Sequence, residues 1–284
     1  MISKNLAQRL IVAAIAIPAI LFMVFKGGDL FFYFLLLLVL IGSFEYFTGT
    51  GTRLFSPFAF LPLIITAGAA ALFMRGYLNW AIWLIIACFV FIGILLAVRG
   101  DPVEALFKKL SYIVWGCLYL ALLYPFVFMV RGEAVWMADA PGCWWVFLLL
   151  ASLWVGDTAA MFFGSQCGKH KLAPTVSPNK TWEGFWGGFI GTLLVAVIFK
   201  LAWLTDTAFY HLAAIAIITA FFGQLGDLVE SLWKRSIGIK DSSAIIPGHG
   251  GVLDRFDSLL FAAPAVYFYL KYVMGAPWLQ NYLI

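Results

Sequence analysis

Long, uninterrupted runs of apolar residues alternate with short polar connections along the whole chain. A membrane-crossing helix needs about 20 mostly apolar residues, and nine of the runs meet that length. The predicted spans are 8–26, 29–47, 55–74, 77–98, 110–130, 142–164, 184–204, 208–229 and 253–274. Because apolar and polar residues do not alternate within the runs, the pattern predicts helices and argues against a transmembrane β-barrel.

The composition strengthens this prediction. Of the 284 residues, 64% are hydrophobic and 11% are charged, and the mean hydropathy is +0.98. A soluble domain is about half apolar and a quarter charged, so a soluble enzyme, a disordered chain and a disulfide-stapled secreted domain are excluded. The four cysteines lack the spacing of a metal or redox site and are expected to pack as small residues. The predicted fold class is an all-α polytopic membrane protein.

The distribution of basic residues predicts how the chain is oriented. With the N-terminus in the cytoplasm and nine spans, 13 of the 18 Lys and Arg residues fall on the cytoplasmic side. The positive-inside rule therefore favours an N-in, C-out topology, with the first run retained as a helix. The two longest polar stretches, 165–183 and 231–252, then face the cytoplasm, where we expect the chemistry. The net charge of +4 comes from scattered residues and does not indicate nucleic-acid binding.

One polar connection carries helix-start signals. Asp101 suits an N-cap and Pro102 suits a first helical turn. The segment 101–110 also places several apolar residues on one helical face. It predicts a short, separate interfacial helix with a structural role.

Acidic residues concentrate in the second half of the chain. Asp227 and Glu230 are three residues apart near the end of the eighth predicted span, and Asp254 and Asp257 have the same spacing at the start of the ninth. An offset of three places each pair on one helical face. Asp157, in the sixth span, is either a packed, partnered carboxylate or a wall of the same site. Ionisable groups at membrane depth are costly and usually mark a functional site.

Such carboxylates need counter-charge, and two sources are open. A divalent cation such as Mg²⁺ suits hard oxygen ligands. The alternative is a set of separate salt bridges with Lys234, Arg235 and Arg255. The spacing alone does not exclude either one.

Two polar segments suit phosphate binding. Residues 247–251 form a glycine-rich run before the predicted ninth span, where backbone amides and a helix N-terminus favour anions. Residues 177–184 offer hydroxyl, amide and ammonium groups together. A flexible turn and an ordinary solvated loop are the respective alternatives.

The same segments carry a recognisable pattern. Ser231-Leu232-Trp233-Lys234-Arg235, Lys240-Asp241 and the stretch from His249 to Asp257 resemble the signature of the phosphatidate cytidylyltransferases. Ser177-Pro178-Asn179-Lys180-Thr181 with Glu183-Gly184 resembles a further motif of that family. The resemblance is densest over 150–260, and Trp233 stands where a smaller apolar residue is usual. By this resemblance, residues 1–140 are expected to form a scaffold of membrane helices and residues 141–284 the catalytic region.

The resemblance implies a nine-helix enzyme of the bacterial inner membrane, commonly a homodimer, whose site faces the cytoplasm. It implies the reaction of CTP with phosphatidate to give CDP-diacylglycerol and diphosphate. Mg²⁺ is the implied cofactor, at Asp227 and Asp254 with Glu230 and Asp257 as further candidates, and a monovalent cation such as K⁺ has a place beside it. The expected catalytic residues are Asp227, Asp254, Lys180 and Arg255. The expected substrate-binding residues are Ser177, Asn179, Lys180, Thr181, Lys234, Arg235, Lys240, His249, Gly250 and Gly251.

Two other function classes stay open at this stage. A CTP-dependent lipid or polyprenol kinase would share a polar membrane site but transfer the γ-phosphate, leaving CDP rather than diphosphate. A transporter would need polar residues through several spans, and the second to fifth spans have very few.

Overall fold

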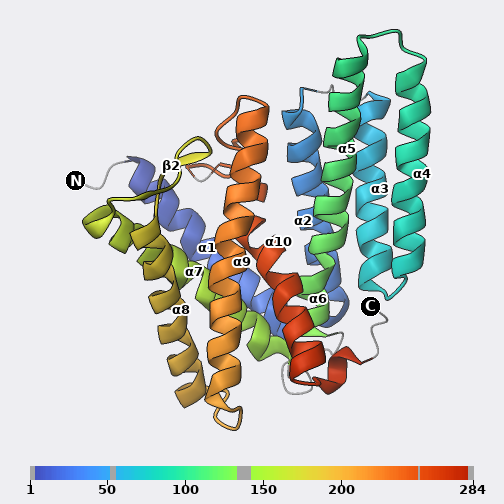
Figure 1. Cartoon of the computed structure of the whole chain (residues 1–284). Helices are drawn as coiled ribbons and strands as arrows, with labels where there is room; N and C mark the ends of the chain where they lie inside the picture. Colours follow the sequence, from blue (N-terminus) through green and yellow to red (C-terminus); the bar gives the residue numbers. More distant parts are fainter. Residues whose placement is uncertain (1–3, 52–55, 133–141, 249, 281–284) are drawn as a thin grey trace.

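A computed structural model describes residues 4–51, 56–132, 142–248 and 250–280 of the chain. The described chain folds almost entirely into helices, with one small β-hairpin (Figure 1). The first six helices are α1 (Lys4–Lys26), α2 (Gly28–Gly49), α3 (Pro57–Met74), α4 (Leu78–Ala97), α5 (Val103–Leu123) and α6 (Pro125–Arg131). The later elements are α7 (Gly142–Cys167), β1 (Lys171–Ala173), β2 (Ser177–Thr181), α8 (Trp182–Ala202), α9 (Phe209–Ser236) and α10 (Leu253–Phe268). A π-helix (Tyr269–Val273) and a 3₁₀ turn (Pro277–Leu279) follow α10.

Within the described residues, seven helical segments are long and apolar enough to cross a membrane. This agrees with the predicted all-α polytopic membrane protein. The two remaining predicted spans correspond to α1, whose apolar part is Leu10–Lys26, and to α10, which has 16 residues before its π-helical continuation. The apolar part of α1 and the α-helical part of α10 are each shorter than the usual span of about 20 residues.

The prediction of a separate interfacial helix at 101–110 is wrong. Helix α5 begins at Val103 and continues without a break to Leu123, and Asp101 pairs with Arg99 at 3.0 Å instead of capping a helix. No proline interrupts the segment until Pro125, which starts α6 because it lacks a backbone N–H. Lys108 and Lys109 of this segment lie over aromatic rings, and Lys109 Nζ is 4.3 Å from the centre of the Phe58 ring.

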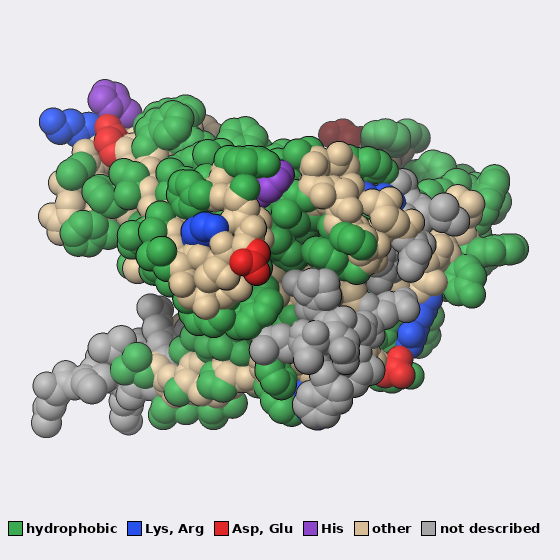
Figure 2. All heavy atoms as spheres, turned by 90° about the horizontal axis from the view of Figure 1, so that it is seen from below, with side chains coloured by type: hydrophobic (Ala, Val, Ile, Leu, Met, Phe, Trp, Pro, Cys, Tyr) green, Lys and Arg blue, Asp and Glu red, His purple; other side chains and the backbone are tan. Residues whose placement is uncertain are grey.

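The helices form two groups joined by α6 and α10. Helices α2 to α5 pack together on one side, and α7, α8 and α9 pack together on the other (Figure 1). The hairpin lies at the upper end of α7 and α8 in this view. The opposite end of the bundle shows mostly hydrophobic side chains with separated charged ones among them (Figure 2).

A tight turn fixes the first helix against the bundle. Gly27, between α1 and α2, has φ +64°, and a side chain there would overlap the guanidinium group of Arg131. Arg131 is fully buried and donates from Nε to the Val24 carbonyl at 2.9 Å and from Nη2 to the Phe25 carbonyl at 3.1 Å. These bonds satisfy carbonyl groups of the last turn of α1 and hold α1 against α6.

The predicted polar stretch 165–183 is partly ordered as a hairpin. Strands β1 and β2 pair antiparallel, with Lys171 opposite Thr181 and Ala173 opposite Ser177. Strand β2 leads directly into α8, and the Thr181 hydroxyl accepts a hydrogen bond from the Gly184 amide at 3.1 Å. This N-cap fixes the strand residues relative to the helix.

The segment between α9 and α10 turns back into the bundle, so α10 begins below the upper end of α9 (Figure 1). An isolated bridge between Ile246 and Gly250 closes the turn. The first turn of α10 therefore lies beside the last turns of α9, where the predicted acidic pairs meet.

Candidate functional site

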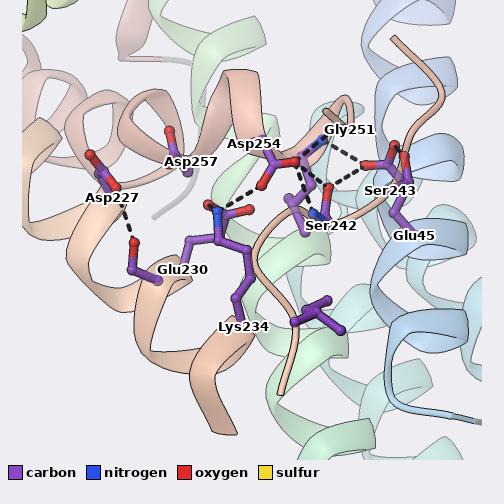
Figure 3. Close-up of polar contacts among 12 residues, drawn as sticks. Glu45, Asp227, Glu230, Lys234, Ser242, Ser243, Gly251, Asp254 and Asp257 are labelled. Atoms are coloured by element: carbon purple, nitrogen blue, oxygen red, sulfur yellow. Dashed lines mark hydrogen bonds and ion pairs between the residues drawn. The ribbon is translucent and has the colours of Figure 1, made fainter. Parts of the chain in front are cut away.

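One face of α9 carries Asp227, Glu230 and Lys234, at helical offsets of three and four. Glu230 is buried, and its Oε2 accepts from Lys234 Nζ at 2.7 Å. Asp227 is partly exposed and points from the same face (Figure 3). The sequence prediction that these groups share a helical face is confirmed.

Asp254, in the first turn of α10, has contacts on both of its carboxylate oxygens (Figure 3). Its Oδ1 accepts from Lys234 Nζ at 2.7 Å. Its Oδ2 accepts from the backbone amides of Ser242 at 2.9 Å and Gly251 at 2.8 Å, and lies 3.0 Å from Ser242 Oγ. Lys234 therefore bridges acids of two different helices.

The carboxylates still outnumber the basic groups that face them. Glu230 Oε1 is buried, and none of the described residues donates a hydrogen bond to it. Asp257 is buried and accepts from the amide of its neighbour Ser258 at 2.6 Å. Asp227 and Asp257 lie close enough for their charges to interact. A site with this surplus of carboxylate oxygen suits an additional cation.

The hairpin closes a polar cavity of about 560 Å³ over α9. Asn179, Lys180 and Thr181 of β2 line it, together with Asp157 and Asp227. Lys180 Nζ pairs with Asp227 Oδ2 at 2.6 Å, which joins the motif at 177–184 to the acidic cluster. The predicted phosphate-binding strand and the predicted metal-binding helix are thus in direct contact.

A second cavity, of about 300 Å³, lies between α1, α7 and α10. Apolar residues of α1 and α7 form much of its wall, and Asp254, Arg255 and Asp257 contribute polar groups from α10. Asp157 lines both cavities. It lies beside Lys180 and Asp227 in the first cavity and beside Arg255 and Asp257 in the second, which favours the expectation that it is a wall of the site.

The remaining predicted binding residues have varied positions. Ser177 begins β2 and is half-buried, and Lys240 is exposed on the segment after α9. Arg235 donates from Nε to the Val176 carbonyl at 3.4 Å and from Nη1 to the Ile239 carbonyl at 3.1 Å, so it joins α9 to the hairpin turn. His249 lies outside the described residues.

Gly250 and Gly251, two of the predicted binding residues, make contacts within the segment between α9 and α10 or with the first turn of α10. Gly250 has φ +83°, and its carbonyl accepts from the Ile246 amide at 2.9 Å. The Gly251 amide donates to Asp254, so in this arrangement it faces a carboxylate rather than a phosphate. The expected role of Gly250 and Gly251 in substrate binding stays a prediction.

The two predicted sources of counter-charge can now be compared with the contacts. Lys234 forms the expected salt bridges, whereas Arg235 bonds backbone carbonyls and Arg255 lines the second cavity. Among residues 4–51, 56–132, 142–248 and 250–280, no three His, Cys, Asp or Glu side chains converge as a ready-made metal site. The donor chemistry nevertheless fits Mg²⁺, because the oxygen donors are carboxylates and Glu230 Oε1 is a buried acceptor without a partner.

The sequence reasoning missed Glu45 of α2. This carboxylate is fully buried and accepts hydrogen bonds from the segment that holds Asp254 (Figure 3). A signal was present, since Glu45 is the one acidic residue between positions 30 and 100, inside a predicted span. A lone ionisable group at membrane depth calls for a partner, but its partners are about 200 residues away in sequence.

The fold and the site define a polytopic helical membrane protein with a buried acidic cluster between a polar and a largely apolar cavity. The model of the cytidylyltransferase family matches residues 7–273. The chain therefore belongs to the cytidylyltransferase family, and the membership that its motifs indicate is confirmed.

Individual relatives have similar sequences over part of their length. The chain is 41% identical over 164 residues to the phosphatidate cytidylyltransferase of Bacillus subtilis, and the match covers 58% of this chain and 59% of that protein. It is 41% identical over 158 residues to that of Staphylococcus saprophyticus, covering 56% and 58%. It is 39% identical over 158 residues to that of Staphylococcus aureus, with the same coverage. The chain thus spans less than two thirds of the length of each of these three relatives.

Proposed function

We propose that this protein is a phosphatidate cytidylyltransferase, which transfers the cytidylyl group of CTP to phosphatidate and yields CDP-diacylglycerol and diphosphate. The observation that carries the proposal is the contact between the motif at 177–184 and the acidic cluster, where Lys180 of the hairpin meets Asp227. The family match and the names of the relatives support it.

The two cavities suit the two substrates. The polar cavity offers an amide, an ammonium and a hydroxyl group to a nucleotide triphosphate. The second cavity combines an apolar wall from α1 with Arg255 and the α10 carboxylates, which suits a lipid whose phosphate meets a charged group while its chains remain in an apolar setting. Asp157 lines both cavities, so it would lie between the two reactants.

The residues have defined tasks in this reaction. A phosphate oxygen of phosphatidate attacks the α-phosphorus of CTP, and the bond from that phosphorus to the β-phosphate oxygen breaks to release diphosphate. Lys180 and Arg255 face the approaching anions and offset the charge that develops on the leaving group. Lys234, Arg235 and Lys240 lie at the α9 end of the site as further positive charges. The attacking phosphate is already ionised at neutral pH, so no residue is required as a general base.

Mg²⁺ is the proposed cofactor, with K⁺ as its proposed companion ion. Asp227 and Asp254 would hold the divalent ion, supported by Glu230 and Asp257, and Lys180 and Lys234 would give up part of their present contacts. When bound, the ion supplies charge neutralisation and orientation of the phosphate oxygens.

The larger architecture follows the same proposal. Nine membrane spans, with α1 and α10 as the two short ones, would place the N-terminus and the site in the cytoplasm of a bacterium, with the protein in the inner membrane and forming a homodimer. Residues 1–140 would form the scaffold and residues 141–284 the catalytic region. The charge distribution supports the orientation, since 13 of 18 basic residues fall on the side of the site.

The test is transfer of label from CTP to lipid. Purified protein in detergent receives phosphatidate, Mg²⁺ and CTP labelled on the α-phosphate in one reaction and on the γ-phosphate in another. We expect α-label in the lipid and γ-label in released diphosphate. A CTP-dependent kinase would place the γ-label in the lipid and leave the α-label in CDP, and that result would overturn the proposal.

A further inference from the structure

Glu45 reaches the site from a helix that carries none of the family motifs. It lies near the end of α2, is 0% exposed, and neighbours Tyr46, which stacks on Trp233 of α9 at 4.5 Å. Its position in the sequence places it in the predicted scaffold. Its contacts place it against the segment that ends at Asp254.

Two hydrogen-bond donors lie against each carboxylate oxygen of Glu45. Oε1 accepts from the Ser243 hydroxyl at 2.6 Å and the Val252 amide at 2.8 Å. Oε2 accepts from the Leu253 amide at 2.7 Å and lies 3.2 Å from the Ser242 hydroxyl. Four donors thus surround one carboxylate in a buried setting, which fixes its orientation.

Two of these donors belong to the start of α10. The first N–H groups of a helix have no partner within the helix, and the residue before α10, Val252, makes no side-chain cap. Glu45 supplies the missing acceptor from another helix, and its negative charge lies at the positive end of the α10 dipole. The carboxylate therefore holds the helix end from which Asp254 projects one residue later.

A third contact links Glu45 to Asp254 more directly. The Ser242 hydroxyl lies between the two carboxylates, 3.2 Å from Glu45 Oε2 and 3.0 Å from Asp254 Oδ2, and its single proton can serve only one of them at a time. The backbone of Gly251 passes so close that a side chain there would overlap Ser242 Oγ and both Glu45 oxygens. The dashed contacts of Figure 3 run from Glu45 through Ser242 to Asp254.

We propose that Glu45 is a positioning residue for the reaction: it sets the orientation of Asp254 by holding the start of α10 and the 242–252 segment. The inference rests on the proposed function, because Asp254 is assigned its role there. Glu45 itself faces neither cavity.

Glu45→Gln is the direct test, since the amide keeps the size but loses the charge and turns one acceptor oxygen into an NH₂ group facing two donors. Loss of a supporting contact of this kind costs about 10- to 100-fold in activity. We expect a fall of that size in kcat with little change in the KM for either substrate. Glu45→Asp, which restores the charge, should recover part of the loss.

A second measurement reports on positioning without substrates. Amide hydrogen exchange of the protein in detergent should become faster in the peptides covering 242–256 of Glu45→Gln, while those of α3 and α4 keep their wild-type rates. Ser43→Ala is the matched control: Ser43 is buried on the same helix, and its hydroxyl has no partner. It should leave activity and exchange unchanged.

The outcomes separate the two proposals. Local exchange that quickens together with a kcat loss supports positioning, whereas unchanged activity or unchanged exchange at 242–256 overturns it. Exchange that quickens across all helices would show a general structural role and would also overturn it. If Glu45→Gln does not fold, Ser242→Ala tests the contact between Glu45 and Asp254 instead. Its kcat and its hydrogen exchange at 242–256 are judged by the same criteria. If the wild type transfers no label, the proposed function fails, while the exchange result still decides whether Glu45 holds this segment.

Discussion

Lys234 is the residue on which the acidic cluster is centred. Its ammonium group is buried and lies 2.7 Å from a carboxylate oxygen of Glu230 and 2.7 Å from one of Asp254. Removing one partner of a buried ion pair leaves an uncompensated charge, so the three groups depend on one another. Substitutions at this site therefore need controls for folding as well as for activity.

Asp227 and Asp254 carry the sharpest prediction at the residue scale. Asp227→Asn and Asp254→Asn keep the shape of the side chain but lose its charge, and each should lower activity by about 100-fold or more with the fold retained. Because both would hold the one proposed metal ion, the double variant should lose much less than the product of the single losses. Label transfer and a thermal melt of each variant in detergent provide the measurement.

The salt-bridge alternative makes a different forecast for the same residues. If the aspartates only pair with lysine, activity should not require a divalent cation. Full activity after exhaustive chelation, or losses that multiply in the double variant, would contradict the shared metal centre.

Lys180 gives a second prediction. It pairs with Asp227 at 2.6 Å and lines the polar cavity, so Lys180→Ala should reduce turnover by about 100-fold through loss of positive charge beside the phosphates. Lys171→Ala is the matched control, because Lys171 is exposed on the partner strand. Near-normal activity of Lys180→Ala in the label-transfer assay would show that β2 is an ordinary basic segment with no role in phosphate binding.

At the scale of elements, the junction between β2 and α8 decides where the motif strand points. Thr181 is 6% exposed and caps α8 through its hydroxyl. Thr181→Ala should lower the free energy of unfolding by about 1 kcal/mol, the usual cost of losing an N-cap. A denaturant or thermal melt in detergent measures it, with Thr175→Ala in the exposed turn as control. Equal stability of the two variants would show that the cap does not hold the strand.

The sequence predicts the helices well because their signal is local. Apolar runs identify every long helix, yet the helix-start residues at 101–110 suggest a separate interfacial helix where α5 is continuous. There, aromatic rings accommodate the lysines, and only the folded neighbours reveal that contact.

The site is predictable only in part, for a related reason. Helical spacing brings Asp227 to Glu230 and Asp254 to Asp257, but it does not show that Lys234 would join the two helices. Glu45 and Ser242 meet across 197 positions, so no local pattern connects them.

At the scale of the whole molecule, orientation in the membrane is the main prediction. Single cysteines placed in the exposed parts of 165–183 and 231–252, in a background without the native cysteines, should resist a membrane-impermeant thiol reagent in intact cells. A cysteine in the connection between α8 and α9 should be labelled, because that connection lies at the opposite end of the bundle (Figure 1). The reverse labelling pattern would mean that the site faces outward.

The buried Lys234 also has a consequence for how the protein is made. The carboxylates of an acidic cluster in a membrane would repel one another during assembly. Here the ammonium group of Lys234 supplies the positive charge beside Glu230 and Asp254. Insertion and folding then do not depend on the supply of divalent ions in the cell. With the proposed cofactor, scarcity of magnesium would slow each copy of the enzyme while leaving the number of copies in the membrane unchanged.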